Sequence, residues 1–312
     1  MKERAELSSE LLNLQGLDSR VLQDPETAHI MAIENSLVSS RTVEGLDVEV
    51  SERPDGIDLK VVVEEDVIIK RPVHVCFGVL HRRALQRIKI DLTLKEGSRA
   101  NFIAHCLFPN AEEVKHLMDA SILIGEGAQM HYTETHYHGI AGGAVVVPRA
   151  RVKVLKAGKY TSLFELKRGR VGSLEIDYDV EAMEDAVVEL IARVFGHGDD
   201  RINIKERAVL SGERARGLIK TRIALENEAK ASVEGITEAK AAHARGHVDC
   251  LEIVKDSAIA KAVPVVEVEH SLAKVTHEAA IGSIDRHQLE TLMARGLRPE
   301  KAVEVIVEGL LR

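Results

Sequence analysis

Short turns recur along the middle of this 312-residue chain at two spacings, and the longer spacing is about twice the shorter. From turn to turn the chain advances by 30, 31, 27 and 28 residues, and then by 15, 15, 14 and 15 residues. This near-doubling is typical of a flattened β-helix, in which each coil has two strands and a turn at each edge. An antiparallel sandwich, whose turns recur every 8–12 residues or so, is the alternative. The third residues of the successive turns are Ser98, Ala128, Lys159, Ala186, Arg214, Ala229, Ala244, Ala258 and Ala273.

Residue patterns divide the chain into three segments. Residues 1–44 are predicted to be helical, with an apolar face and a second helix that begins at Asp24-Pro25-Glu26. Residues 45–283 alternate between apolar and polar positions and are predicted to form the β-helix core. Residues 284–312 are predicted to form two helices: Asp285 caps the first, Gly296 ends it, and Pro299 begins the second. The residues of the N-terminal apolar face are Leu7, Leu11, Leu12 and Leu14.

Composition narrows the class of protein. The chain has no Trp and only 3% aromatic residues, so its core is expected to consist of Val, Ile, Leu and Ala, which suits layered strands. A net charge of -8 argues against a nucleic-acid partner, and no apolar run of about 18 residues predicts a membrane span. The three cysteines are far apart and form no Cys-x-x-Cys motif, and the first residues do not resemble a secretion signal. We therefore expect free thiols and a cytoplasmic location.

The last fifty residues carry a specific motif series. It reads Pro264-Val-Val-Glu267, then a strand with His277-Glu278, then Asp285-Arg-His-Gln288-Leu289, then Arg295-Gly296-Leu297. This series resembles the C-terminal signature of the SUF-system iron–sulfur scaffold family, the SufB/SufD proteins. In that family a Pro-x-x-Glu strand precedes a His-Glu or His-Gly pair, an Asp/Glu-x-Gln-Leu motif and an Arg-Gly-Leu motif. The order matches without a gap from Pro264 to Leu297, although Asp285 lies one residue further from Gln288 than the acidic residue of the family motif.

The resemblance implies both a fold and a function. It implies an all-β protein with a right-handed parallel β-helix core and short helical segments at both ends. It implies a scaffold rather than an enzyme, on which sulfur, carried as persulfide, and iron form a transient nascent cluster of the 4Fe-4S type. The implied partners are a SUF-type ABC ATPase, a second scaffold chain in a homodimer or a SufB/SufD-like heterodimer, a sulfur donor and a cluster acceptor. The residues implied to bind the ATPase are Gln288, Leu289, Arg295, Gly296 and Leu297.

Cys250 and His277 are the strongest candidates for the functional site. The repeat makes Ala244 equivalent to Ala273, so Cys250 lies six residues and His277 four residues past the equivalent position. Both offsets are even, so both side chains are expected on one side of adjacent strands, whereas Glu278 should point the other way. A thiol beside an imidazole suits a soft metal or sulfur, although a buried structural Cys and a surface His remain the alternative. The resemblance adds Glu278, because SufB members combine this Cys with His-Glu.

The motif His131-x4-His136-x-His138 is a second candidate. Alternation puts His136 and His138 on one face of a strand, which suits a metal ion. The alternative is a group of solvent-facing histidines at a coil edge. No Glu follows at the spacing that a cupin requires, so a cupin is not expected. Cys76 and Cys106 lie in apolar stretches and are expected in the core.

Two other functions remain as alternatives. One is a β-helix carbohydrate-active enzyme, a lyase or hydrolase, but such sites usually need aromatic platforms for sugar rings, and this chain has few aromatics. The other is a structural repeat protein without a bound metal.

Overall fold

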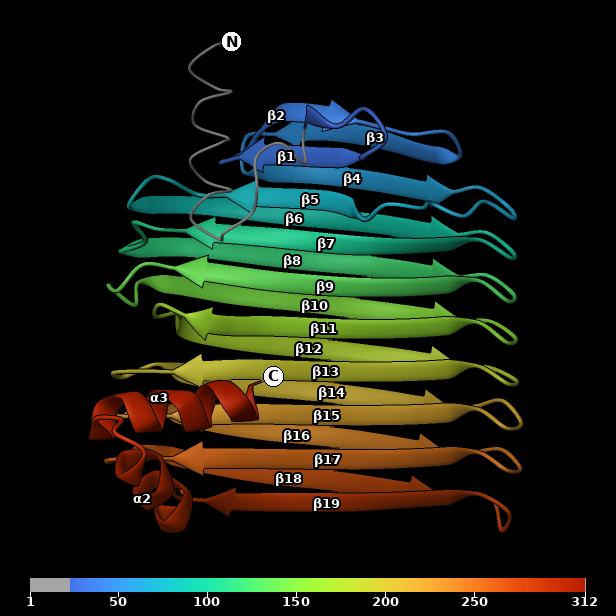
Figure 1. Cartoon of the computed structure of the whole chain (residues 1–312). Coiled ribbons are helices and arrows are strands. Elements are labelled where there is room, and N and C mark those ends of the chain that lie inside the picture. Colours follow the sequence, from blue (N-terminus) through green and yellow to red (C-terminus); the bar gives the residue numbers. More distant parts are fainter. Residues whose placement is uncertain (1–22, 312) are drawn as a thin grey trace.

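Residues 23–311, which the computed structural model describes, form a parallel β-helix with two helices at its C-terminal end (Figure 1). The predicted parallel β-helix is confirmed, and the antiparallel sandwich is excluded for the coils. Each coil contributes one strand to each of two facing sheets, which contain 10 and 9 strands in this part of the chain. The first sheet contains β1 (His29–Ile33), β2 (Ser36–Arg41), β5 (Val73–Gly78), β7 (Arg99–Phe108), β9 (Gln129–His138), β11 (Lys159–Arg168), β13 (Val187–Gly196), β15 (Arg216–Leu225), β17 (Arg245–Val254) and β19 (Lys274–Gly282). The second contains β3 (Leu46–Arg53), β4 (Gly56–Val63), β6 (Arg83–Leu94), β8 (Glu113–Ile124), β10 (Ala144–Val154), β12 (Gly172–Ala182), β14 (Arg201–Leu210), β16 (Lys230–Ala239) and β18 (Ile259–Val268).

The two ends of the β-helix differ. At the N-terminal end, β1 pairs with β2 and β3 pairs with β4, and both pairs are antiparallel hairpins. At the C-terminal end, β18 and β19 are the outermost strands of their sheets, so each has one edge without a partner strand in the described chain. The N-terminal end of the described chain therefore consists of antiparallel hairpins, with β2 and β3 outermost, while the C-terminal end presents the edges of the parallel strands β18 and β19.

The core follows from strict alternation along each strand. In β13 every second residue, from Val188 to Val194, is completely buried. Parallel pairing without a register shift then stacks equal positions, so Leu190 lies level with Ser162 on one side and Ile219 on the other. Inward side chains fill the space between the sheets, and a cavity among the upper coils has a volume of only about 20 Å³. The interior is thus a packed core and not a pore.

The turns explain the spacing in the sequence. At one edge, residues such as Asp185 and Arg214 adopt left-handed backbone conformations, with φ of 57° and 59°. Backbone hydrogen bonds connect these turns from coil to coil; the Asp185 N–H, for example, donates to the carbonyl of Glu213 at 2.9 Å. In the inner coils a small residue such as Ala186 or Ala244 follows the turn and is completely buried. This regular edge produces the spacing near 30 residues, and the opposite edge becomes equally regular only in the later coils.

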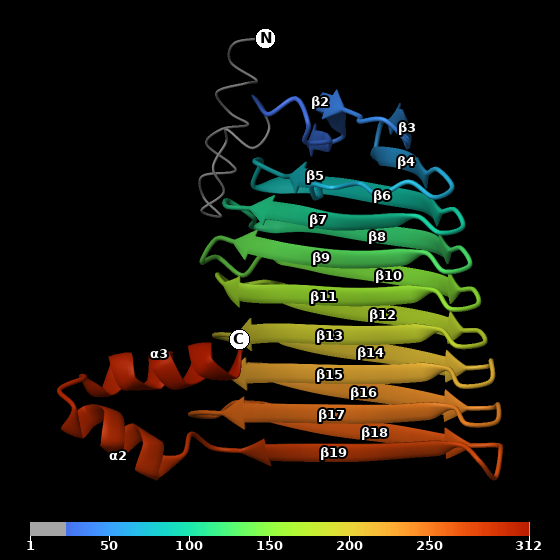
Figure 2. The same ribbon diagram turned by 45° about the vertical axis from the view of Figure 1, so that its right-hand side comes forward.

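The two C-terminal helices have the predicted boundaries. Helix α2 spans Arg286–Ala294, and the Asp285 side chain caps it by accepting a hydrogen bond from the Gln288 N–H at 2.6 Å. Gly296, with a φ of +92°, follows α2, and helix α3 spans Pro299–Leu310. Figure 2 shows both helices projecting beyond the edge of the lower coils. No helix in residues 23–311 is long and apolar enough to cross a membrane.

The prediction that a helix begins at Asp24-Pro25-Glu26 is wrong. The Asp24 side chain accepts a hydrogen bond from the Glu26 N–H at 3.1 Å, and its carbonyl accepts one from the Thr27 N–H at 3.1 Å. These bonds form a turn, and β1 and β2 follow it. Pairing of β1 with β5 extends the sheet, so tertiary contacts override the local helix signal. The predicted apolar face from Leu7 to Leu14 lies outside the described residues.

Candidate functional site

Strands β17 and β19 bring Cys250 and His277 to the same side of the sheet. His277 pairs with Val248, and Cys250 pairs with Ala279, so the two residues are on adjacent strands and two positions apart. Val248 is completely buried in the interior, which identifies the face of the sheet that His277 shares. The predicted placement of this pair on one face of adjacent strands is therefore confirmed.

The two members of the pair differ in exposure. Cys250 is only 1% exposed, and burial raises the pKa of its thiol to about 11, with the nearby acidic Glu252 contributing to the shift. His277 is exposed, because no further coil covers β19. The site thus combines a covered thiol with an imidazole that reaches the open end of the β-helix.

Glu278 lies on the other face of β19, as alternation predicts. It pairs with Asp249, whose carboxylate accepts hydrogen bonds from the Arg222 guanidinium, one of them at 3.0 Å. This contact lowers the pKa of Asp249. Without a change in the backbone of β19, Glu278 therefore faces away from Cys250 and His277.

An apolar surface surrounds the open end. Side chains of the last coils that would be covered in an inner coil are exposed here, including Val268 at 48% and Ile281 at 47%. A groove of about 860 Å³ runs between the end of β19 and the two helices, with Glu252 and Leu292 among its lining residues. The exposed strand edges and this groove both lie at the C-terminal end of the β-helix.

The residues predicted to bind a partner lie on or just after α2. Gln288, Arg295 and Gly296 are exposed, while Leu289 and Leu297 are half-buried. No residue of α2 is buried. Helix α3 is anchored better: Val307 and Leu311 pack against Ala224 of β15. The helix pair is therefore attached through α3 and leaves α2 accessible.

His136 and His138 are buried inside the β-helix, at 3% and 2% exposure, so the solvent-facing alternative for them is wrong. His131 does face outward. Their neighbours were not predicted from the sequence: Cys106 and Glu134 lie beside His136, and all three residues are buried. The signal was available: Cys106 precedes His136 by 30 residues, one coil, and the two pair in register. Cys76 and Cys106 are buried free cysteines, as expected.

Comparison with known proteins identifies the family. The SufBD core domain, described as SUF system FeS cluster assembly, matches residues 82–310. An iron–sulfur cluster assembly SufBD family protein of Methanocaldococcus jannaschii is 37% identical over 282 residues, which cover 90% of this chain and 89% of that protein. A protein of the same description from Pyrococcus horikoshii is 31% identical over 302 residues, which cover 97% and 92% of the two chains. The chain therefore belongs to the SufBD family of iron–sulfur cluster assembly proteins. This assignment favours cluster assembly over the carbohydrate-active alternative.

Proposed function

We propose that this protein is a scaffold subunit that receives sulfur and iron and builds a nascent iron–sulfur cluster at the open end of the β-helix. The observation that carries the proposal is the register of β17 and β19, which aligns Cys250 and His277 on one face beside the accessible end. A thiolate and an imidazole are suitable ligands for iron. The nascent cluster, of the 4Fe-4S type, is cargo and leaves with an acceptor protein.

Cys250 is proposed as the sulfur-handling residue. A thiolate at this position exchanges with a donor persulfide: it takes the terminal sulfur, and the donor leaves as a thiolate. His277 then serves as an iron ligand, and Glu278 joins it if the backbone of β19 shifts. Cys250 has little exposure and a raised pKa, so the pair needs an opening at the last coil or iron itself to form the thiolate.

Anaerobic reconstitution with ferrous iron and sulfide tests this site. Cys250→Ser is nearly isosteric and should retain the fold but lose most bound iron and sulfide. His277→Ala should weaken binding less, by about 10- to 100-fold, the range for the loss of a supporting interaction at a metal site. The matched controls are Cys76→Ser, at another buried cysteine, and His247→Ala, on the opposite face of β17. A Cys250→Ser/His277→Ala double variant that reconstitutes like the parent would exclude the site.

We further propose that α2 and α3 bind an ABC-type ATPase, with Gln288, Leu289, Arg295, Gly296 and Leu297 at the contact. The support is the exposure of α2, which has no buried residue and needs contacts beyond its own to be stable. Arg295→Glu reverses an exposed charge and should abolish co-purification with the ATPase, whereas Glu175→Gln on the outer face of β12 should not. Undiminished binding by Arg295→Glu and by a chain that lacks residues 285–312 would place the contact elsewhere.

A second scaffold chain is proposed to cover the open end. Unpaired edges of β18 and β19 and exposed apolar side chains such as Val268 support this pairing. Val268→Lys should then shift the parent dimer towards monomer in sedimentation analysis, while Ile140→Lys, at an exposed loop far from this end, should leave the assembly unchanged. A parent chain that stays monomeric, alone and with a related scaffold chain, would contradict the pairing.

A further inference from the structure

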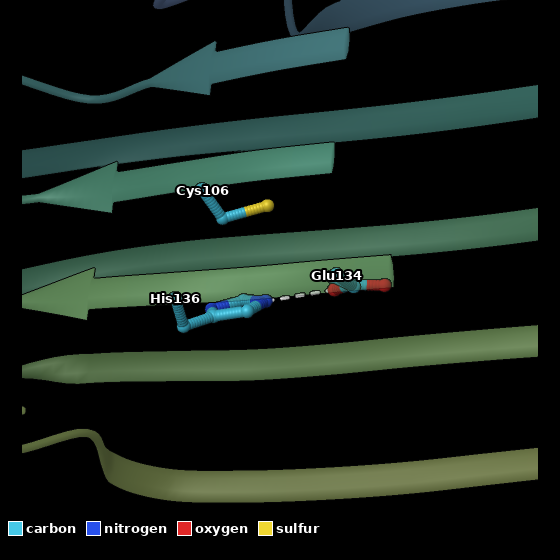
Figure 3. Close-up of side chains that lie close together, drawn as sticks. All are labelled: Cys106, Glu134 and His136. Atoms are coloured by element: carbon cyan, nitrogen blue, oxygen red, sulfur yellow. Dashed lines mark hydrogen bonds and ion pairs between the residues drawn. The ribbon is translucent and has the colours of Figure 1, made fainter. Parts of the chain in front are cut away.

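A compact group of metal-binding side chains lies inside the upper half of the β-helix, far from the open end. Cys106 Sγ, a carboxylate oxygen of Glu134 and a ring nitrogen of His136 lie within 4.8 Å of one another (Figure 3). All three residues are buried, with exposures of 0%, 1% and 3%. Glu134 and His136 are two positions apart on β9, so both point inward, and Cys106 pairs with His136 from β7. Two adjacent coils thus converge on one point.

A fourth donor comes from the opposite sheet. His116 of β8 approaches Cys106, with its Nε2 at 3.9 Å from Sγ. Its Nδ1 is 2.8 Å from the Gln86 Oε1, and the Gln86 amide nitrogen donates to the backbone carbonyls of Glu34 and Gly78. Because these carbonyls fix the amide, Oε1 must accept the proton of Nδ1. His116 therefore directs an unprotonated Nε2 towards Cys106.

The other ligands are also held by hydrogen bonds. The hydroxyl groups of Tyr132 and Tyr178 donate hydrogen bonds to Oε2 of Glu134, at 3.3 Å and 3.4 Å. His136 Nε2 lies 2.7 Å from the Glu134 Oε1, and its Nδ1 lies 3.2 Å from the His138 Nε2. Metal-bound histidines usually donate their second ring nitrogen to such a partner, and outer contacts of this kind orient the ligands. The group therefore contains candidate metal ligands and, around them, the hydrogen-bond partners that would orient those ligands.

The chemistry of the group explains why an ion would belong there. Burial of a polar group in an apolar core is unfavourable unless the group is fully compensated. Cys106, His116, Glu134 and His136 are all buried in the interior of the β-helix. A divalent cation compensates one thiolate and one carboxylate completely and uses the neutral imidazoles as they stand.

We propose that Cys106, His116, Glu134 and His136 bind one divalent transition metal ion, for which Zn²⁺ is the most suitable candidate. One sulfur, two imidazole nitrogens and one carboxylate oxygen form the mixed donor set of four that tetrahedral zinc prefers. A bound ion would replace the 2.7 Å hydrogen bond between His136 Nε2 and Glu134 Oε1, and side-chain rotations would bring the four donors to coordination distance. The ion joins β7, β8 and β9 across the interior and is a resident structural ion rather than cargo.

This site is independent of the proposed cluster site. Strands β9 and β17 are separated by four steps in their sheet, which amounts to about 19 Å at roughly 4.8 Å per step. The three cysteines therefore provide separate tests: Cys106 for the buried ion, Cys250 for the cluster, and Cys76 as a control. Cys76 is equally buried, but it packs with Met31 and lies outside the ligand group.

The test is the metal content of the full chain produced with added Zn²⁺ or, in parallel, Co²⁺. The parent protein should contain one equivalent of tightly held ion, and the Co²⁺ form should show a sulfur-to-cobalt charge-transfer band. Cys106→Ser should lose this band and most of the ion, and His136→Gln should reduce the stoichiometry. Cys76→Ser and Cys250→Ser should keep both signals.

Two results would overturn the proposal. One is a parent chain that holds less than about a tenth of an equivalent of ion, both as produced and after refolding with Zn²⁺ or Co²⁺. The other is a Cys106→Ser variant that keeps the charge-transfer band. Because the parent protein is measured first, a variant that fails to fold does not decide the outcome. Loss of cluster reconstitution in Cys250→Ser with the ion retained separates the two sites.

Discussion

Glu206 provides a quantitative test of the packed interior. This residue of β14 lies between Tyr178 and Gly235 in its sheet and is 1% exposed. Its Oε2 has no hydrogen-bond partner among the described residues. Burial raises the pKa of Glu206 from 4.5 to about 8, because the charged carboxylate loses its hydration inside the β-helix. The folded protein therefore holds this proton more tightly than the unfolded chain.

The sign and size of the effect follow from this difference in pKa. Stability from the protonated group is fully present below pH 4.5 and is lost as the pH rises towards 8. Each pH unit between these values removes about 1.4 kcal/mol from the free energy of unfolding. The accumulated loss is about 3 kcal/mol at pH 7 and about 4 kcal/mol at pH 8. Glu206→Gln keeps the shape and abolishes the titration, so the variant should avoid this loss.

Urea denaturation of the parent and the variant between pH 4.5 and pH 8 measures the effect. The free energies of unfolding should be similar at the acid end and should diverge in favour of Glu206→Gln as the pH rises. Glu175→Gln, at an exposed position of β12, is the control and should track the parent at every pH. A constant difference between parent and Glu206→Gln from pH 4.5 to pH 8 would refute the reasoning.

Three further predictions concern close contacts and the C-terminal helices. Gly143→Ala should destabilise the fold by more than about 2 kcal/mol in urea denaturation, because a Cβ there would lie 2.1 Å from a backbone oxygen of the preceding coil. Gly282→Ala, with open space around it, should be neutral, and equal effects of the two would contradict this contrast. Asp285→Ala removes the α2 cap, costs about 1 kcal/mol and should speed hydrogen exchange in α2 about fivefold; unchanged exchange would contradict it. Val307→Asp buries a charge against Ala224 and should detach α3, seen as faster exchange in α3 with β11 unchanged; retained protection of α3 would speak against this docking.

Much of the fold could be predicted because a β-helix repeats itself in sequence. Buried small residues such as Ala186 and Ala244 mark the turns at one edge, and they set the period. The same period placed Cys250 and His277 on one face, which the register confirms. The hairpin of β1 and β2 was missed because the place of β1 in its sheet is set by pairing with β5, far along the chain, and not by the local residues.

The buried metal-binding group was only half predicted. Alternation placed His136 and His138 together, but it does not say which face of a strand points inward. Met130 and Tyr132 have the same parity and are buried, and these apolar side chains could have identified the inner face. His116 could not be found in this way, because it comes from the opposite sheet and meets Cys106 only across the folded interior.

The height that one coil adds to the β-helix determines how far apart its two ends can lie. Each coil adds the same increment of height, so the distance between the interior of the upper coils and the last coil changes only in steps of about 4.8 Å. Gain or loss of one whole coil of about 29 residues would change that separation by one step and leave the hairpins and both helices with the same neighbours. Gain or loss of a few residues would instead be absorbed in a turn at the edge. The separation between the interior of the upper coils and the last coil can therefore change only by whole coils.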